Sequence, residues 1–307
     1  MTGGGGIYRN RGSNMISFFT NLINGLSLGS IYAIIAIGYT MVYGIAKMLN
    51  FAHGDVIMVG AFTAFTVIST MGLPVPLGIL ASIVVCTCLG LTIEKIAYKP
   101  LRKAASPLAV LITAIGVSYF LQNAALLVFG SDTKMFTSVV PFQTIPVGPF
   151  IIPGTTIVSI VVSVILVAAL QTFINKTKPG QAMLACSQDR DAASLMGISV
   201  NGTISLTFAI GSAMAAIAGV LLCSAYPALS PTTGAMPGIK AFVAAVFGGI
   251  GSIPGAMIGG LVLGVIEILA RSYISSQLSD AIVFSVLIIV LLFRPTGLFG
   301  KVIQEKV

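Results

Sequence analysis

Long runs of apolar residues, separated by short polar segments, dominate the chain. Several runs are about 20 residues long, which is the length that an α-helix needs to cross the hydrocarbon core of a bilayer. They cover residues 18–45, 56–71, 76–97, 107–129, 155–175, 203–226, 236–270 and 281–293. The pattern predicts an all-α polytopic membrane protein with about eight transmembrane helices, one or two of them broken or re-entrant.

The composition supports this prediction and decides how the net charge is interpreted. Apolar residues make up 56% of the 307 residues, charged residues 8%, and the mean hydropathy is +1.05, whereas a soluble domain carries roughly 25% charged residues. The net charge of +8 arises mainly from Lys and Arg in segments beside apolar runs, as the positive-inside rule describes for membrane proteins. We therefore expect contact with a lipid bilayer and no binding of nucleic acid.

The first interruption of the apolar pattern lies at residues 47–55. Polar residues and glycines inside a membrane span are tolerated where the backbone is buried in protein or lines a wet cavity. The segment is therefore either a helix break near a translocation path or an ordinary short loop at the membrane face, and the sequence favours neither. The residues of interest are Asn50, His53, Gly54 and Asp55.

The second interruption lies inside the run 236–270, where glycine and proline make an uninterrupted helix unfavourable. If Arg294 is cytoplasmic and Tyr226 is not, this run must cross twice or turn back. The sequence therefore predicts a broken, re-entrant pair of helices. The residues at this break are Gly248, Gly249, Gly251, Pro254 and Gly255. Two similar breaks suggest the paired repeats that are common in transporters.

A polar loop, residues 176–200, separates two apolar runs and carries Lys176, Lys178 and Arg190, which places it in the cytoplasm. Residues 181–196 suit a single helix, with Gly197 placed to end it. Sixteen helical residues reach about 24 Å along the axis. We interpret this loop as a docking element for a partner that moves the transmembrane part.

Residues 1–14 are polar and rich in glycine, and we interpret them as a disordered leader or a non-native extension. They lack the small-residue cleavage site that follows the apolar core of a signal peptide. Residues 15–307 are then the transmembrane domain, with the loop at 176–200 as part of it.

The sequence shows no catalytic chemistry. It has no GxxxxGK[ST] loop for the phosphates of ATP, no HExxH motif, and a single histidine, which cannot supply a multi-histidine metal site. We therefore expect neither catalytic residues, nor a metal, nor a cofactor in this chain. Glu267 and Arg271 share one helix face, and we interpret them as a structural ion pair at a helix end.

Three separated motifs resemble one known family. Residues 24–55 (NGLSLGSIYAIIAIGYTMVYGIAKMLNFAHGD), 176–198 (KTKPGQAMLACSQDRDAASLMGI) and 240–260 (KAFVAAVFGGIGSIPGAMIGG) closely resemble the permease of bacterial branched-chain amino acid ABC transporters, and the terminal RPTGLFG (294–300) fits as well. The resemblance covers nearly everything from Met15 onward. It implies the ABC importer permease fold in the inner membrane and import of leucine, isoleucine and valine.

The resemblance also implies partners and site residues. The partners would be a second, related permease, two cytoplasmic ATPases that hold the ATP, and a periplasmic binding protein that delivers the substrate. The interruption residues named above match the family's broken-helix motifs. The residues that match its ATPase-coupling loop are Gly180, Ala182, Ala185, Asp189, Ala192, Leu195, Met196, Gly197 and Ile198.

Other functions stay open from the residues alone. A member of the same family could import another small amino acid, urea or an amide. A secondary transporter or channel would need no ATPase, but the docking loop and the scarcity of membrane carboxylates argue against it. An intramembrane enzyme using His53 and Asp55 is disfavoured, because their spacing of two places them on different faces of a helix.

Overall fold

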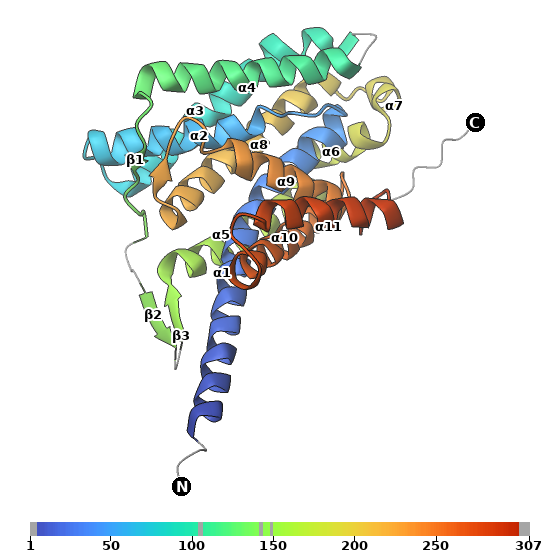
Figure 1. The fold of residues 1–307 in the computed structure, drawn as a ribbon. Helices are drawn as coiled ribbons and strands as arrows, with labels where there is room; N and C mark the ends of the chain where they lie inside the picture. Colours follow the sequence, from blue (N-terminus) through green and yellow to red (C-terminus); the bar gives the residue numbers. More distant parts are fainter. Residues whose placement is uncertain (1–4, 104–106, 141–143, 148–149, 301–307) are drawn as a thin grey trace.

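The computed structural model describes residues 5–103, 107–140, 144–147 and 150–300, and these are almost entirely helical (Figure 1). By length and composition, seven of the described helical stretches could cross a membrane: Met15–Ala46, His53–Thr70, Val75–Tyr98, Leu108–Phe129, Gly154–Lys176, Val200–Ala225 and Ile253–Tyr273. Two shorter apolar helices, Ala235–Gly248 and Ser279–Phe293, accompany them. The predicted all-α polytopic fold with interrupted helices is confirmed.

Most helices follow one another with short connections, but residues 130–153 separate α4 from α5. Their bounds are α1 Gly5–Ala46, α2 His53–Phe65, α3 Val75–Ile93, α4 Pro107–Phe129, α5 Gly154–Lys176, α6 Lys178–Gln188, α7 Arg190–Leu195, α8 Val200–Ala225, α9 Ala235–Gly248, α10 Ile253–Tyr273 and α11 Ser279–Phe293. Two π-helical turns, η1 Thr66–Thr70 and η2 Glu94–Tyr98, extend α2 and α3, and a short 3₁₀ turn, η3 Pro100–Lys103, follows. Residues 5–14 continue α1, residues 1–4 lie outside the described part, and the leader stays a prediction.

Four short strands were not predicted. They are β1 Lys134–Met135, β2 Thr144–Val147, β3 Phe150–Pro153 and β4 Ala228–Leu229. Strand β1 pairs antiparallel with β4, with Lys134 opposite Leu229, and β2 pairs with β3. The first pair ties the segment after α4 to the segment after α8. Both segments therefore lie at one end of the bundle.

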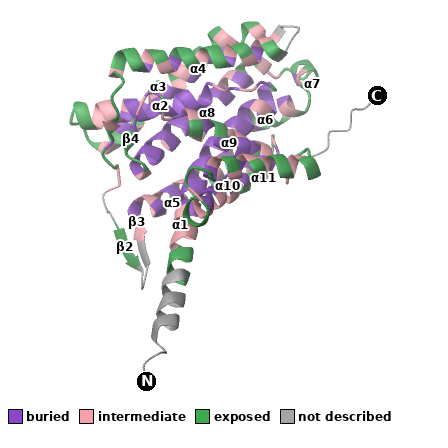
Figure 2. Ribbon diagram, in the orientation of Figure 1, coloured by how far each residue is buried: buried purple, intermediate pink, exposed green. Residues whose placement is uncertain are grey.

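Helix α1 is the centre of the fold, and α10 packs closely along it (Figure 2). A Cβ added to Gly264 of α10 would lie 2.2 Å from the Cα of Gly29 in α1, so these backbones touch without side chains between them. Small residues allow such contact where lipid gives no hydrophobic drive for helix association. Helices α4 and α5 instead leave most of their apolar side chains partly or fully exposed.

Candidate translocation path and coupling loop

The first interruption is a buried break between α1 and α2. Helix α1 ends at Ala46, and Lys47 follows with a left-handed φ of 50°. Asn50 is buried, and its Oδ1 accepts a hydrogen bond of 2.9 Å from the hydroxyl of the buried Tyr98 in η2. The connection is therefore a helix break buried in protein, and its place on a translocation path stays a prediction.

His53 and Asp55, at the start of α2, are both buried and have different surroundings. Gln122 of α4 donates a 2.9 Å hydrogen bond to Asp55 Oδ1. His53 lies edge-on to Tyr39, with ring centres 4.7 Å apart, and its Nε2 has no hydrogen-bond partner among the described residues. Among the described residues, these two side chains belong to no group of three or more potential metal ligands.

The second interruption lies between α9 and α10, where the sequence predicted it. Gly249 and Gly251 have φ values of 103° and 96°, which side-chain-bearing residues rarely adopt. Ser252 caps α10 by accepting a hydrogen bond from the N–H of Gly255, and Pro254 stands in the first turn, where its missing N–H costs nothing. A Cβ added to Gly248 would lie 2.0 Å from the carbonyl oxygen of Gly255, so the two helix ends touch.

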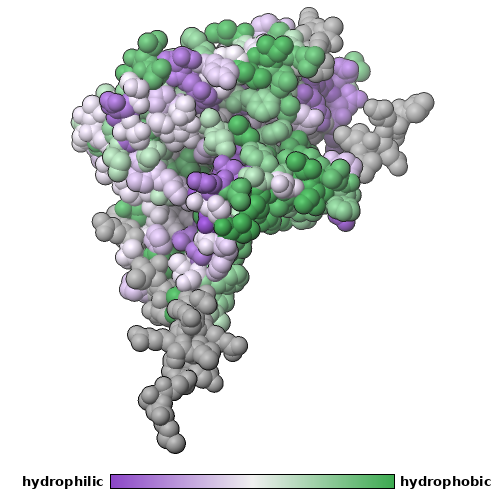
Figure 3. Space-filling view, in the orientation of Figure 1, coloured by the Kyte–Doolittle hydropathy of each residue, from purple (hydrophilic) through white to green (hydrophobic). Residues whose placement is uncertain are grey.

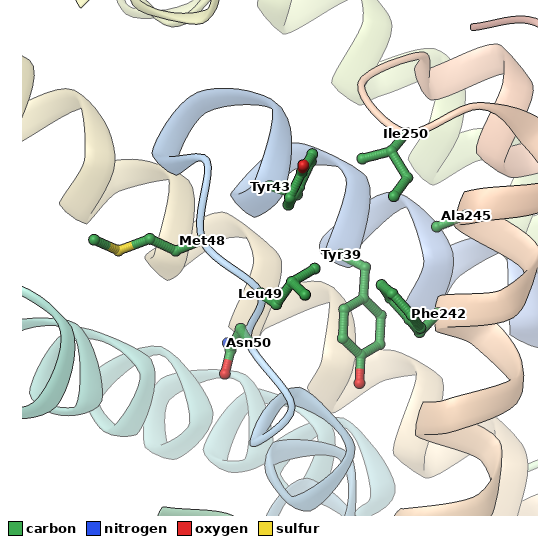
Figure 4. A pocket seen from close by; sticks show the side chains of 8 residues that line it. All are labelled: Tyr39, Tyr43, Met48, Leu49, Asn50, Phe242, Ala245 and Ile250. Atoms are coloured by element: carbon green, nitrogen blue, oxygen red, sulfur yellow. The ribbon is translucent and has the colours of Figure 1, made fainter. Parts of the chain in front are cut away.

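The structure brings the two breaks together around one small pocket (Figure 4). Leu49 and Asn50 from the first break and Ile250 from the second line it, beside Tyr39 of α1 and Phe242 of α9. The remaining lining residues are Tyr43, Met48 and Ala245. The cavity is about 10 Å³, room for about one water molecule and far too little for an amino acid. A path through this point therefore requires the helix ends to move apart.

The loop at 176–200 forms two helices, so the prediction of a single helix over 181–196 is wrong. Asp189 adopts an extended conformation between α6 and α7. Its carboxylate accepts hydrogen bonds of 2.9 Å and 3.0 Å from the N–H groups of Asp191 and Ala192, so it caps α7 instead of continuing α6. The predicted stop is confirmed, since Gly197 ends the helical segment with a φ of 83°.

The residues of loop 176–200 that match the family's ATPase-coupling motif divide into partly or fully buried anchors and an exposed tip. Gly180 is buried against the last turn of α5, where a Cβ would lie 2.4 Å from the Cα of Ile174. Ala182, Ala185 and Ile198 are half-buried. Asp189, Ala192 and Gly197 are exposed, and Leu195 and Met196 are 88% and 83% exposed. Two large apolar side chains held in solvent by a structured loop are typical of a surface that another protein covers.

Arg190 connects this loop to the first break. Its Nε and Nη2 donate hydrogen bonds of 3.1 Å and 2.8 Å to the carbonyl oxygen of Ile45, in the last turn of α1. Burial lowers the pKa of the Arg190 guanidinium, and the positive charge of Arg102 lowers it further, yet an arginine stays charged at neutral pH. A cation at the C-terminal end of a helix satisfies an unpaired carbonyl and complements the helix dipole.

A charged cluster at the opposite ends of α9 and α10 was only partly predicted. The expected ion pair of Glu267 and Arg271 is present. Lys240, whose part in this cluster was not predicted, also contacts Glu267 at 2.7 Å and Asp280 at 2.6 Å. A lysine inside an apolar run is by itself a sign of function, because a charge within a membrane span is costly. This sign could have identified Lys240 from the sequence.

Comparisons with known proteins agree with this architecture. Residues 21–291 match the family model for the permease component of the branched-chain amino acid transport system. The chain is 47% identical over 302 residues to the high-affinity branched-chain amino acid transport system permease protein BraD of Pseudomonas aeruginosa, covering 94% of this chain and 98% of that protein. It is 46% identical over 303 residues to the permease protein LivH of the corresponding system of Escherichia coli, with the same coverage.

The chain also resembles a more distant protein. The chain is 29% identical over 286 residues to the probable branched-chain amino acid transport permease protein LivH of Methanocaldococcus jannaschii, covering 88% of this chain and 89% of that protein. The family model and the relatives span nearly the whole helical bundle described above, including both breaks and the loop. The chain therefore belongs to the family of branched-chain amino acid transport system permease components.

Proposed function

We propose that this chain is a transmembrane subunit of an ATP-driven importer that moves leucine, isoleucine and valine across the bacterial inner membrane by alternating access. The chain itself would be a transport subunit without catalytic activity. ATP would be bound and hydrolysed on two separate ATPase subunits, a second permease would complete the path, and a periplasmic binding protein would deliver the substrate. The family and the named functions of its relatives support the substrate class.

The observation that carries the proposal is the hydrogen-bonded contact between Arg190 and Ile45. It connects the exposed Leu195–Met196 tip of the loop, through α7, to the end of α1 at a helix break. The break at 249–252 packs against the same end of α1, since a Cβ on Gly44 would lie 3.4 Å from the Cα of Gly251. A partner that pulls on the loop therefore acts on both breaks at once.

Differential binding is the physical requirement for such coupling. An ATPase can shift the permease between two states only if it binds those states with different affinities. The loop offers an apolar tip that an ATPase can hold, and its anchors at Gly180 and Arg190 transmit displacement to the membrane helices. A secondary transporter has no need of such a surface.

The proposal is tested by isolating this chain in mild detergent and identifying the subunits that accompany it by native mass spectrometry. A variant in which residues 189–196 are replaced by a Gly-Ser linker is isolated in parallel. We expect two ATPases and a second permease with the unaltered chain, and loss of the ATPases alone with the linker variant. The chain isolated without ATPases, and still moving leucine in vesicles without ATP, contradicts the proposal and favours a secondary transporter.

A further inference from the structure

A second, larger cavity lies at the end of the bundle opposite the coupling loop. It measures about 310 Å³ and lies between α1, α8, α9, α10 and the start of α11. Figure 3 shows hydrophilic atoms gathered beside the start of α11, next to the hydrophobic outer side of that helix. Ala228 of β4 lines it, and because α8 is long enough to cross the membrane from the predicted cytoplasmic loop, that end lies on the outer side. We call it the outer cavity.

The outer cavity contains two basic and two acidic side chains, and these differ in how many of their hydrogen-bonding atoms have partners. Glu267 is fully buried: one carboxylate oxygen accepts from Lys240 and Arg271, and the other accepts a 2.9 Å hydrogen bond from the hydroxyl of Tyr32. Lys240 is nearly buried and bridges Glu267 and Asp280. These contacts leave Glu267 and Lys240 with their charges compensated inside the protein, as buried charges require.

Arg271 and Asp280 differ from the buried pair because they keep free hydrogen-bonding atoms. Their side chains are 38% and 41% exposed. They are not paired with each other within the described chain, although the hydroxyl of Ser279 lies 3.4 Å from both Arg271 Nε and Asp280 Oδ1. No hydrogen bond among the described residues uses Nη1 of Arg271 or Oδ2 of Asp280. One free cationic donor and one free anionic acceptor therefore stand side by side.

Apart from Thr233 and the hydroxyl groups of two tyrosines, the rest of the outer cavity is apolar. Leu28, Leu222, Met236 and Pro237 line it together with the rings of Tyr32 and Tyr226. A volume of about 310 Å³ is at the lower end of the range for small-molecule sites, which are mainly apolar with a few placed polar groups. An opposite pair of charges beside an apolar wall complements a zwitterion that carries an apolar side chain.

We propose that the outer cavity is a binding site for the branched-chain amino acid on its way into the membrane domain. Arg271 holds the α-carboxylate, Asp280 holds the α-ammonium group, and the apolar wall receives the side chain. Lys240 and Glu267 position these two residues. The inference rests on the proposed function for the identity of the substrate, but the site itself is assigned from the charges and the cavity.

The test measures protection of a thiol in the full complex, reconstituted in nanodiscs without the binding protein. Met236→Cys places the thiol at the cavity wall, and Cys88→Ser removes the exposed native cysteine. The probes are L-leucine, leucinamide, which lacks the carboxylate, and 4-methylpentanoate, which lacks the ammonium group. We expect leucine to slow maleimide labelling, and each analogue to need about tenfold higher concentration, because each loses a charge-assisted hydrogen bond.

Two charge-removing variants make the assignment specific. Arg271→Gln should weaken protection by leucine about tenfold and abolish the difference between leucine and leucinamide. Asp280→Asn should also weaken protection by leucine about tenfold, and it should abolish the difference between leucine and 4-methylpentanoate. Arg294→Gln, which removes a cation just beyond the other end of α11, should leave protection unchanged. Thermal unfolding of each variant checks that the fold is intact.

Several results would overturn the inference. Leucine that gives no protection, analogues that protect as well as leucine, or variants that behave like the unaltered complex would each contradict it. A thiol that maleimide cannot reach in the assembled complex would show that another subunit fills the cavity. Uptake of labelled leucine, measured in proteoliposomes with the binding protein and ATP present, separates the two proposals. Normal uptake by Arg271→Gln and Asp280→Asn contradicts the cavity alone, whereas no uptake by the unaltered complex contradicts the proposed function.

Discussion

The two helix breaks meet at the same pocket but are stabilised in opposite ways. The break at 47–52 depends on polar side chains: Asn50 bonds to Tyr98, and Asp55 just beyond it bonds to Gln122. The break at 249–252 depends on the absence of side chains, because glycines let the ends of α9 and α10 touch. Backbone N–H groups of Leu298 and Phe299 then satisfy the carbonyls of Phe247 and Gly248 at 2.9 Å and 3.0 Å.

This difference shows two ways in which a membrane protein can interrupt helices inside a buried bundle. Every backbone polar group freed by a break needs a new partner. The second break obtains its partners from the segment after α11, which folds back onto the end of α9. The first break instead holds its connecting chain with buried side chains. The glycine break should therefore be sensitive to added volume, and the polar break to loss of a hydrogen-bonding group.

The largest effect is expected from added volume at the glycine break. Gly255→Val places a Cβ 2.4 Å from the carbonyl oxygen of Gly248, a backbone atom that cannot yield without separating the helices. We expect a loss of about 3 kcal/mol or more in stability and little folded protein in the membrane, measured by size-exclusion chromatography and thermal unfolding. Gly116→Val in α4 is the control, since a Cβ there has no neighbour within 4 Å. Equal stability of the two variants would contradict the glycine contact.

A smaller loss is expected at the polar break. Asn50→Leu removes the acceptor of the Tyr98 hydroxyl and leaves that buried hydroxyl unpaired, which should cost about 1–3 kcal/mol. Tyr98→Phe in the same chain removes the orphaned hydroxyl and should restore part of the loss. Unfolding of the two single variants and the double variant gives the coupling energy. Strictly additive losses would show that the Asn50–Tyr98 hydrogen bond does not stabilise the break.

A change at Lys47 should have a small, stabilising effect. This residue adopts a left-handed φ of 50°, and burial and the charge of Arg190 lower its pKa. Lys47→Asn should raise the free energy of unfolding by up to about 1 kcal/mol, because asparagine adopts this left-handed conformation more easily than lysine. Lys47→Ala removes the charge but keeps the strain. If both variants raise the unfolding temperature equally, the stabilisation comes from relief of charge repulsion and not from relief of backbone strain.

The coupling loop should show the smallest effect on stability together with a large effect on function. Gly197→Asp meets no atom within 4 Å, and the strain of placing a side chain at a φ of 83° is limited because aspartate tolerates left-handed backbone better than most residues. It also places a negative charge beside the exposed Leu195 and Met196. We expect normal membrane insertion but ATP hydrolysis without leucine uptake in the reconstituted complex. Gly197→Asn has the same shape without the charge and should keep uptake. Normal uptake by the stable Gly197→Asp variant would contradict the role of this surface.

Much of this architecture could be predicted from the sequence, because long apolar runs and helix-breaking residues act locally. Both breaks and the stop at Gly197 follow from residues within a few positions of each feature. The kink at Asp189 was missed although its cause is also local: a carboxylate that caps the next helix competes with continuing the previous one. The aspartate in the middle of this short amphipathic segment is the feature that would have predicted the break between α6 and α7.

The features that the sequence could not give depend on tertiary contacts. Arg190 was assigned only to the cytoplasmic side, and nothing in its neighbourhood indicates a bond to Ile45, 145 positions away. Lys240 and Glu267 meet only because α9 turns back at the second break, and Asp280 joins them from the next helix. The pairing of β1 with β4 likewise links segments about 95 residues apart and has no local signature in strands of two residues.

The central claim, that force on the loop reaches the breaks through Arg190, is tested most directly by the ratio of ATP hydrolysed to leucine imported. Both are measured on the complete complex in proteoliposomes, for the unaltered chain, Arg190→Gln, and Lys178→Gln, which removes an exposed cation from the same loop. The account predicts that Arg190→Gln keeps the ATPases bound but raises this ratio severalfold, whereas Lys178→Gln leaves it unchanged. An unchanged ratio for Arg190→Gln would contradict the claim.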